Sequence, residues 1–116
     1  MSRKATSAVV APSPRLEEAD AAWAGRAEGS QGGRARPGPV RRVIALLRAE
    51  LAEEPLSVAA RWRLMRALYF AGEYASSSEA EAKASFLEAT RIAEECIALL
   101  RDRAAEGSSR DFSHAT

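Results

Sequence analysis

An all-α fold is predicted for this chain by three observations. Alanine supplies much of the 47% hydrophobic fraction, and a composition of Ala with Leu, Glu and Arg is typical of helices. Only 6% of the residues are aromatic and few β-branched residues occur together, so a sheet would have little to pack with. Apolar residues recur at the three- and four-residue spacing of amphipathic helices. We therefore expect four helices in two hairpins with disordered termini.

The chain has 116 residues, which is enough for one small domain with a single core. Residues 1–14 contain two prolines and no apolar periodicity, so we expect a disordered tail there. The helical domain is predicted over residues 15–105, with hairpin 1 at about 15–55 and hairpin 2 at about 56–105. The polar residues 106–116 are expected to be a second disordered tail.

In hairpin 1, the segment LEEADAAWAGRAE (16–28) predicts a helix because its apolar residues have helical spacing and acidic residues occupy its first turns. The glycine- and proline-rich stretch 29–39 predicts a loop. A strongly periodic stretch then begins at Val40 and predicts a second helix, which Glu53, Glu54 and Pro55 close.

In hairpin 2, Ser57 is a candidate N-cap for a helix that ends at Gly72. Ser78, followed by acidic residues, is a candidate cap for the last helix. That helix is predicted from about Glu79 to Ala105.

The formal net charge is +1, which argues against a strongly basic nucleic-acid-binding domain, although the front end is mildly basic. The single cysteine, Cys96, cannot form an internal disulfide, and its place in a helical pattern predicts a buried reduced thiol. The N-terminus lacks the apolar run of a signal peptide, and no stretch reaches the ~20 apolar residues of a membrane span. We expect a cytoplasmic protein, or a periplasmic one if the N-terminus is truncated.

A repeat is indicated by Trp23 and Trp62, which lie 39 residues apart in the first helix of each hairpin. The second hairpin resembles the tetratricopeptide repeat in its Trp62–Tyr69 separation, and Pro55 lies where the preceding repeat would end. The series Ala82, Phe86 and Ala89 has the spacing of that repeat's second helix.

Four longer segments carry a more particular resemblance: LEEADAAWAGRAE, ELAEEP, ARWRLMRALYFAGEY and KASFLEATRIAEECIAL. Over roughly residues 16–101 the chain resembles the TatT component family of TRAP transporters, and bacterial proteins similar to the regulators of microtubule dynamics. The resemblance implies a helical-repeat accessory protein that binds a partner or small ligand. An upstream signal sequence with a lipid-anchored cysteine would favour the transporter role.

Trp62 and Tyr69 are two helical turns apart and share one helix face. They could form a base-stacking platform with neighbouring arginines as phosphate contacts. We favour packing instead, because Met65 and Leu68 beside them complete an apolar face. The predicted structural core comprises Trp23, Trp62, Met65, Tyr69, Phe86 and Ala89.

A partner surface is then expected on the neighbouring positions, by the geometry of the repeat. The predicted partner-binding residues are Arg63, Leu64, Ala67, Phe70 and Arg26. Arg26 and Arg66 could each bind a carboxylate in a groove, or form surface ion pairs with Glu17, Glu18 or Glu73.

No catalytic residues, metal site or cofactor are predicted. The single histidine, His114, lies in a polar tail without cysteine partners at ligand spacing, and no nucleophile–base pair can be placed on the predicted helices. We expect a non-catalytic interaction or adaptor protein that binds a protein or peptide, or self-associates through the last helix. The alternatives are a TRAP-type accessory protein with a truncated start and, less favoured, a nucleic-acid binder using the basic N-terminal region.

Overall fold

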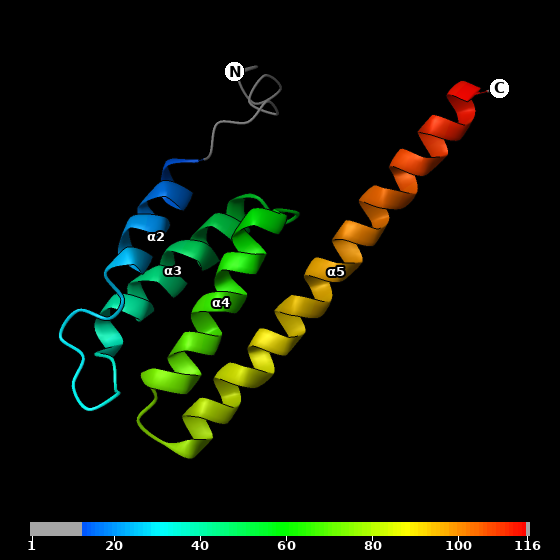
Figure 1. Cartoon of the computed structure of the whole chain (residues 1–116). Coiled ribbons are helices and arrows are strands. Elements are labelled where there is room, and N and C mark those ends of the chain that lie inside the picture. The colour runs from blue at the N-terminus through cyan, green and yellow to red at the C-terminus, as the bar shows by residue number, and fades with distance from the viewer. Residues whose placement is uncertain (1–12, 116) are drawn as a thin grey trace.

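The computed structural model describes residues 13–115 as four helices and their connections. The helices are α2 (Pro14–Ala24), α3 (Pro37–Glu53), α4 (Val58–Tyr74) and α5 (Glu79–Ala115). Successive helices run in opposite directions and lie side by side (Figure 1), with α2 packed on α3, α3 on α4 and α4 on α5. The expected all-α fold of four helices in adjacent pairs is confirmed.

Two predicted N-caps are also confirmed. The Ser57 hydroxyl accepts a hydrogen bond from the Ala60 N–H at 3.0 Å. The Ser78 hydroxyl accepts one from the Glu81 N–H at 3.1 Å, and the Glu81 carboxylate accepts one from the Ser77 N–H at 2.6 Å. This backbone hydrogen bond is the main cause that lowers the pKa of Glu81. Reciprocal capping therefore fixes the start of α5.

The helix ends differ from the predicted ones at several places. The first helix ends at Ala24 rather than Glu28, and α3 begins at Pro37 rather than Val40, because proline suits the first position of a helix. Gly72 does not end α4, which continues to Tyr74. The described backbone of α5 continues past Ala105, where the helix was predicted to end, to Ala115.

The predicted N-terminal tail lies mostly outside the described residues, apart from residues 13 and 14. Ser13 caps α2, since its hydroxyl accepts a hydrogen bond from the Leu16 N–H at 3.0 Å. The loop between α2 and α3 has positive φ angles at Gly29, Gly32 and Gly33, which glycine adopts without strain. The Ala35 N–H donates to the Tyr74 carbonyl at 2.8 Å, which fastens this loop to the end of α4.

The hydrophobic core runs through all four helices, and α4 lies in its middle. Helix α4 buries a stripe of mostly small residues between α3 and α5: Ala60, Leu64, Ala67, Leu68 and Gly72. Small side chains let the flanking helices approach closely. The other helices contribute Leu16, Ala19, Val40, Val43, Leu47, Ala89 and Ile92.

This stripe corrects the predicted core of α4. Trp62 is 39% exposed and Tyr69 is 44% exposed, because both lie on the flank of the helix and not on its buried stripe. Trp23 and Met65 are partly buried and pack against the core, Phe86 is half-buried, and Ala89 is fully buried as predicted. The thiol of Cys96 is free and buried, as predicted.

Ion pairs join neighbouring helices at the margins of the core. Arg15 of α2 reaches the buried carboxylate of Glu50 in α3 at 3.2 Å, and Arg61 of α4 reaches Glu95 of α5 at 3.1 Å. Within residues 13–115, none of the helices combines the length and apolar character that crossing a lipid bilayer requires.

Candidate binding face on helices α2 and α4

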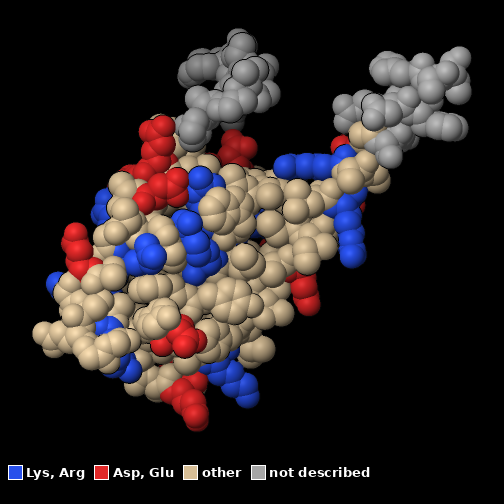
Figure 2. All heavy atoms as spheres, viewed as in Figure 1, with Lys and Arg blue, Asp and Glu red and all other residues tan. Residues whose placement is uncertain are grey.

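Arginine and aromatic side chains gather where α2 and α4 lie next to each other. We define the arginine–aromatic face by eight residues from the two helices and the turn after α2: Asp20, Trp23, Arg26, Trp62, Arg63, Arg66, Phe70 and Tyr74. In Figure 2, basic side chains lie near the middle of this face of the molecule, over α2 and α4.

Trp23 lies at the centre of the face and carries two guanidinium groups. The Cζ atoms of Arg26 and Arg66 each lie 4.1 Å from the centroid of its ring system. The ring of Phe70 meets Trp23 edge-on, with centroids 5.6 Å apart. Cations over an indole ring are attracted by its electron-rich face. Trp23 therefore holds two positive charges close together.

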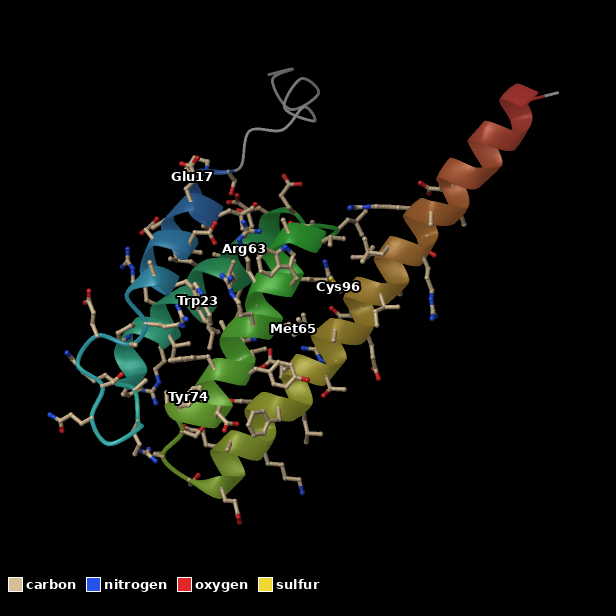
Figure 3. The ribbon with its side chains drawn as sticks, in the orientation of Figure 1. Glu17, Trp23, Arg63, Met65, Tyr74 and Cys96 are labelled. Atoms are coloured by element: carbon tan, nitrogen blue, oxygen red, sulfur yellow. The ribbon has the colours of Figure 1, made fainter. Side chains whose placement is uncertain are left out.

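The second tryptophan extends this arrangement along α4. Arg63 and Arg66 lie 4.7 and 4.9 Å from the Trp62 ring centroid. Tyr74 packs against Phe70 with the two rings tilted by 47° and their centroids 5.0 Å apart. Figure 3 shows Trp23 and Arg63 between α2 and α4, with Met65 on the side of α4 that faces α5.

One carboxylate lies within this group of arginines. Asp20 of α2 accepts two hydrogen bonds from Arg63, at 2.8 and 3.1 Å, and this contact lowers the pKa of Asp20. Arg66 lies 3.9 Å from the same carboxylate. Among the described residues, Asp20 is thus the single acidic partner in the ion pairs of this face, which carries Arg26, Arg63 and Arg66. Arg63 binds it through Nε and Nη2.

Arg66 is the least satisfied of the three arginines. Its Nε is buried and has no hydrogen-bond acceptor in the described part of the molecule. Burial is the first cause that lowers the pKa of Arg66, and the nearby charges of Arg63 and Arg26 add to the effect. Buried polar atoms without partners are uncommon in folded proteins. The face therefore carries positive charge that the protein itself only partly neutralises.

The structure separates the five predicted partner-binding residues into two groups. Leu64 is 2% exposed and Ala67 is 0% exposed, so both belong to the core and their assignment to a surface was wrong. Leu64 follows Trp62 by two positions and Ala67 precedes Tyr69 by two, and helix residues two positions apart point to nearly opposite sides. Arg26, Arg63 and Phe70 all lie on the arginine–aromatic face.

Two members of the face were absent from the sequence-based prediction. Asp20 was assigned only to the acidic first turns of a helix, although its bidentate contact reaches 43 residues along the chain. Tyr74 follows the predicted end of its helix at Gly72, and it joins the face because α4 continues to that residue. The 39-residue tryptophan repeat could have suggested that the two first helices of the hairpins lie together.

A second surface, between α4 and α5, is apolar. Tyr69 lies 6.0 Å from Phe86 in ring-centroid distance, and Ile97 and Leu100 of α5 are 49% and 52% exposed. Leu87 is also exposed on α5. The sequence predicts an unpartnered apolar side on the last helix, and these exposed side chains agree with it.

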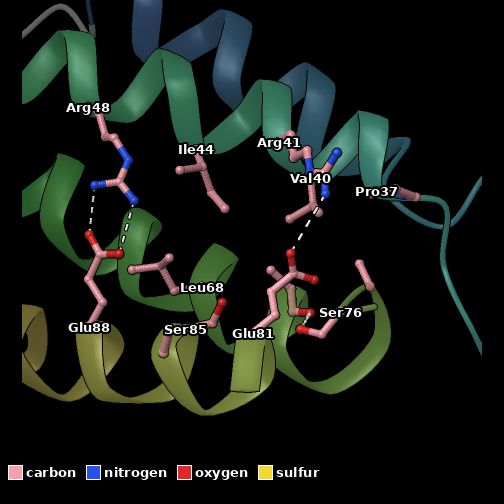
Figure 4. A pocket seen from close by; sticks show the side chains of 13 residues that line it. Pro37, Val40, Arg41, Ile44, Arg48, Leu68, Ser76, Glu81, Ser85 and Glu88 are labelled. Carbon is pink, nitrogen blue, oxygen red and sulfur yellow. Dashed lines mark hydrogen bonds and ion pairs between the residues drawn. The ribbon is translucent and has the colours of Figure 1, made fainter. Parts of the chain in front are cut away.

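A third feature is a groove of about 210 Å³ between α3 and α5, with α4 as its floor. Figure 4 shows Arg48 paired with Glu88, and Arg41 with Glu81, across this groove. Leu68 lies in the floor. Because each arginine here faces a carboxylate of the opposite helix, the groove has less unbalanced charge than the arginine–aromatic face.

Among the side chains that the structure describes (residues 13–107), no three His, Cys, Asp or Glu residues gather as a set of metal ligands would. Searches of protein-family models, curated proteins and solved structures find no match to this chain.

Proposed function

We propose that the chain is a non-catalytic interaction module that binds a segment of a partner protein across the arginine–aromatic face. The observation that carries this proposal is that two incompletely neutralised arginines, Arg26 and Arg66, each lie over the ring of Trp23 at 4.1 Å from its centroid. Tryptophan, tyrosine and arginine are the residue types that contribute most to binding at protein interfaces.

The accessible parts of this face fit a polypeptide ligand. Trp62 and Tyr74 are exposed and offer apolar rings beside the arginines. Such a combination can bury aliphatic or aromatic side chains of a partner while the guanidinium groups bind its polar atoms. The resemblance to the tetratricopeptide repeat supports the same surface, because in that repeat the first helices of successive hairpins face the ligand.

A random peptide library displayed on phage and selected on the folded protein tests the proposal. We expect enriched peptides to bind the wild-type protein, and Trp62→Ala or Tyr74→Ala to weaken them by about tenfold, as loss of an interface aromatic does. Leu87→Ala is the matched control, since Leu87 is an exposed apolar residue on the outer side of α5.

Each outcome of the selection is informative. Enriched peptides that are insensitive to Trp62→Ala and Tyr74→Ala, but sensitive to Leu87→Ala, would move the binding surface to α5. A selection that enriches no binding sequence would refute the peptide-binding role.

A further inference from the structure

Two of the positive charges of the arginine–aromatic face lie close to each other, beside the ring of Trp23. Arg26 and Arg66 lie at equal distances of 4.1 Å from the same Trp23 centroid, so their charges are within twice that distance of each other. Arg63 is engaged by both oxygens of Asp20. Asp20, which Arg66 also approaches at 3.9 Å, balances one of the three positive charges, so a net charge of about +2 remains over a small area.

We propose that Arg26, Arg66 and Trp23 form a subsite for a compact, doubly negative oxyanion on the partner segment. This inference rests on the proposed partner-binding role and specifies its chemistry. Two guanidinium groups present several N–H donors in planar forks, which match the oxygens of phosphate or carboxylate groups. A phosphorylated side chain, or two adjacent carboxylates, would supply the matching charge.

The state of the arginines in the free protein supports this assignment. Arg66 keeps a buried Nε without an acceptor, and its neighbours within reach include two other cations and one carboxylate that is already shared. Arg26 donates one hydrogen bond to the Trp23 carbonyl at 3.0 Å, which holds its guanidinium on the ring. In natural proteins, polar groups that lack hydrogen-bond or charge partners occur mainly at functional sites.

The indole ring gives the subsite its rigidity. Arginine side chains are long and lose conformational freedom when they bind. Stacking on Trp23 restricts both guanidinium groups before a ligand arrives, so less entropy is lost on binding. The edge-on contact with Phe70 keeps the indole in place in turn.

The test is an NMR titration of the full chain with three capped peptides at matched ionic strength. The probes are N-acetyl-phosphoserine amide, the corresponding Asp-Asp dipeptide, and the corresponding single Asp. We expect the doubly charged probes to shift the Trp23 indole and Arg66 Nε signals and to saturate at lower concentration than the single Asp.

Variants then locate the binding. Arg26→Gln and Arg66→Gln should each weaken the doubly charged probes by about tenfold, the contribution of one charge-assisted hydrogen-bonded contact. Arg66→Lys keeps the charge but loses the planar fork, and should also weaken them. Arg101→Gln removes an exposed charge of α5 and should leave the affinity unchanged.

The pH dependence distinguishes the two sources of the dianion. The second pKa of a phosphoserine is about 6, so its binding should weaken between pH 7 and pH 5, whereas Asp-Asp binding should not. Binding of either probe, lost in the Arg26 and Arg66 variants, supports the subsite.

The subsite is refuted if the doubly charged probes bind no more tightly than the single Asp, or if Arg66→Gln weakens them no more than Arg101→Gln. Peptide selection tests the broader role independently. Neutral selected peptides with no dianion binding would overturn the subsite alone, and dianion binding without selected peptides would overturn the peptide-binding role alone.

Discussion

Gly72 of α4 lies directly against the ring of Phe86 of α5. A Cβ atom at position 72 would stand 2.6 Å from the nearest ring carbon, well inside contact distance. This close approach explains why a glycine is present within a helix that continues to Tyr74, where glycine ordinarily costs about 1 kcal/mol relative to alanine.

Gly72→Ala is therefore expected to destabilise the protein, although the same change in an open helix is stabilising. Overpacking a helix contact costs about 1–3 kcal/mol, and we expect the free energy of unfolding to fall by about that amount in urea denaturation. Gly107→Ala in α5 is the matched control, because a Cβ there meets nothing within 4 Å. It should leave stability unchanged or raise it.

The double variant Gly72→Ala with Phe86→Leu tests the cause of that loss. A smaller side chain at position 86 makes room for the new methyl group, so the two effects should not add. Additive losses would show that the clash with Phe86 is not the reason for the glycine.

Leu64 and Trp62 provide a second contrast, because the sequence and the structure assign them in opposite ways. Leu64 is fully enclosed, so Leu64→Ala should lower the free energy of unfolding by about 2–5 kcal/mol, as loss of a core leucine does. Trp62→Ala removes a half-exposed ring and should lower it by about 1 kcal/mol, the scale of its ring contacts with arginines. Thermal unfolding of both variants by circular dichroism measures the difference, and a larger loss for Trp62→Ala would contradict the buried stripe.

These residues also show how far the sequence alone can go. Helix number, helix order and the caps at Ser57 and Ser78 follow from local patterns, because periodicity and capping act within a few residues. Which side of α4 is buried does not follow from local patterns, because more than one side of this helix carries apolar residues. Only the packing of α3 and α5 on either side selects the stripe that contains Ala67 rather than the one that contains Tyr69.

The candidate face has the same limitation. Arg26 and Arg66 could be proposed as anion ligands from the sequence, each beside an aromatic position. Their meeting on one indole depends on α2 and α4 lying together, with Asp20 reaching Arg63 across the gap. No local pattern contains that long-range pairing.

Asp20 leads to a prediction on pH. Its hydrogen bonds with Arg63 lower its pKa in the folded protein. A carboxyl group with a lowered folded pKa stabilises the fold above its unfolded value of about 3.9, and that stabilisation disappears as the pH falls through the folded pKa. Asp20→Asn should therefore be less stable than wild type at pH 7, and the difference should shrink as the pH falls below about 4.

Denaturation curves at a series of pH values check this expectation. Arg63→Gln should produce the same flattening of the pH profile, because it removes the other partner of the contact. A wild-type advantage over Asp20→Asn that persists undiminished near pH 2 would assign the effect to packing rather than to charge.

Arg66 should contribute to binding rather than to stability. Its burial and the nearby cations oppose its charge, as its lowered pKa indicates, while its contacts with two indole rings favour it. Removing the Arg66 charge loses a cation–ring attraction of about 0.5–1 kcal/mol at a partly exposed site. It also removes the cost of holding a partly desolvated charge, so the two effects offset each other. Arg66→Met keeps the length and apolar contacts of the side chain, so we expect the free energy of unfolding to change by less than about 0.5 kcal/mol.

Arg63→Met is the informative comparison for Arg66→Met, because Arg63 makes two hydrogen bonds to Asp20 whereas Arg66 only approaches that carboxylate. It should destabilise the protein more, while Arg66→Met should cause the larger loss of dianion binding in the NMR titration. A larger loss of stability in Arg66→Met would mean that Arg66 serves the fold, and a larger loss of dianion binding in Arg63→Met would move the subsite to Arg63. Loss of dianion binding without loss of stability in Arg66→Met would show that Arg66, which the fold leaves incompletely hydrogen-bonded, serves ligand binding rather than the fold.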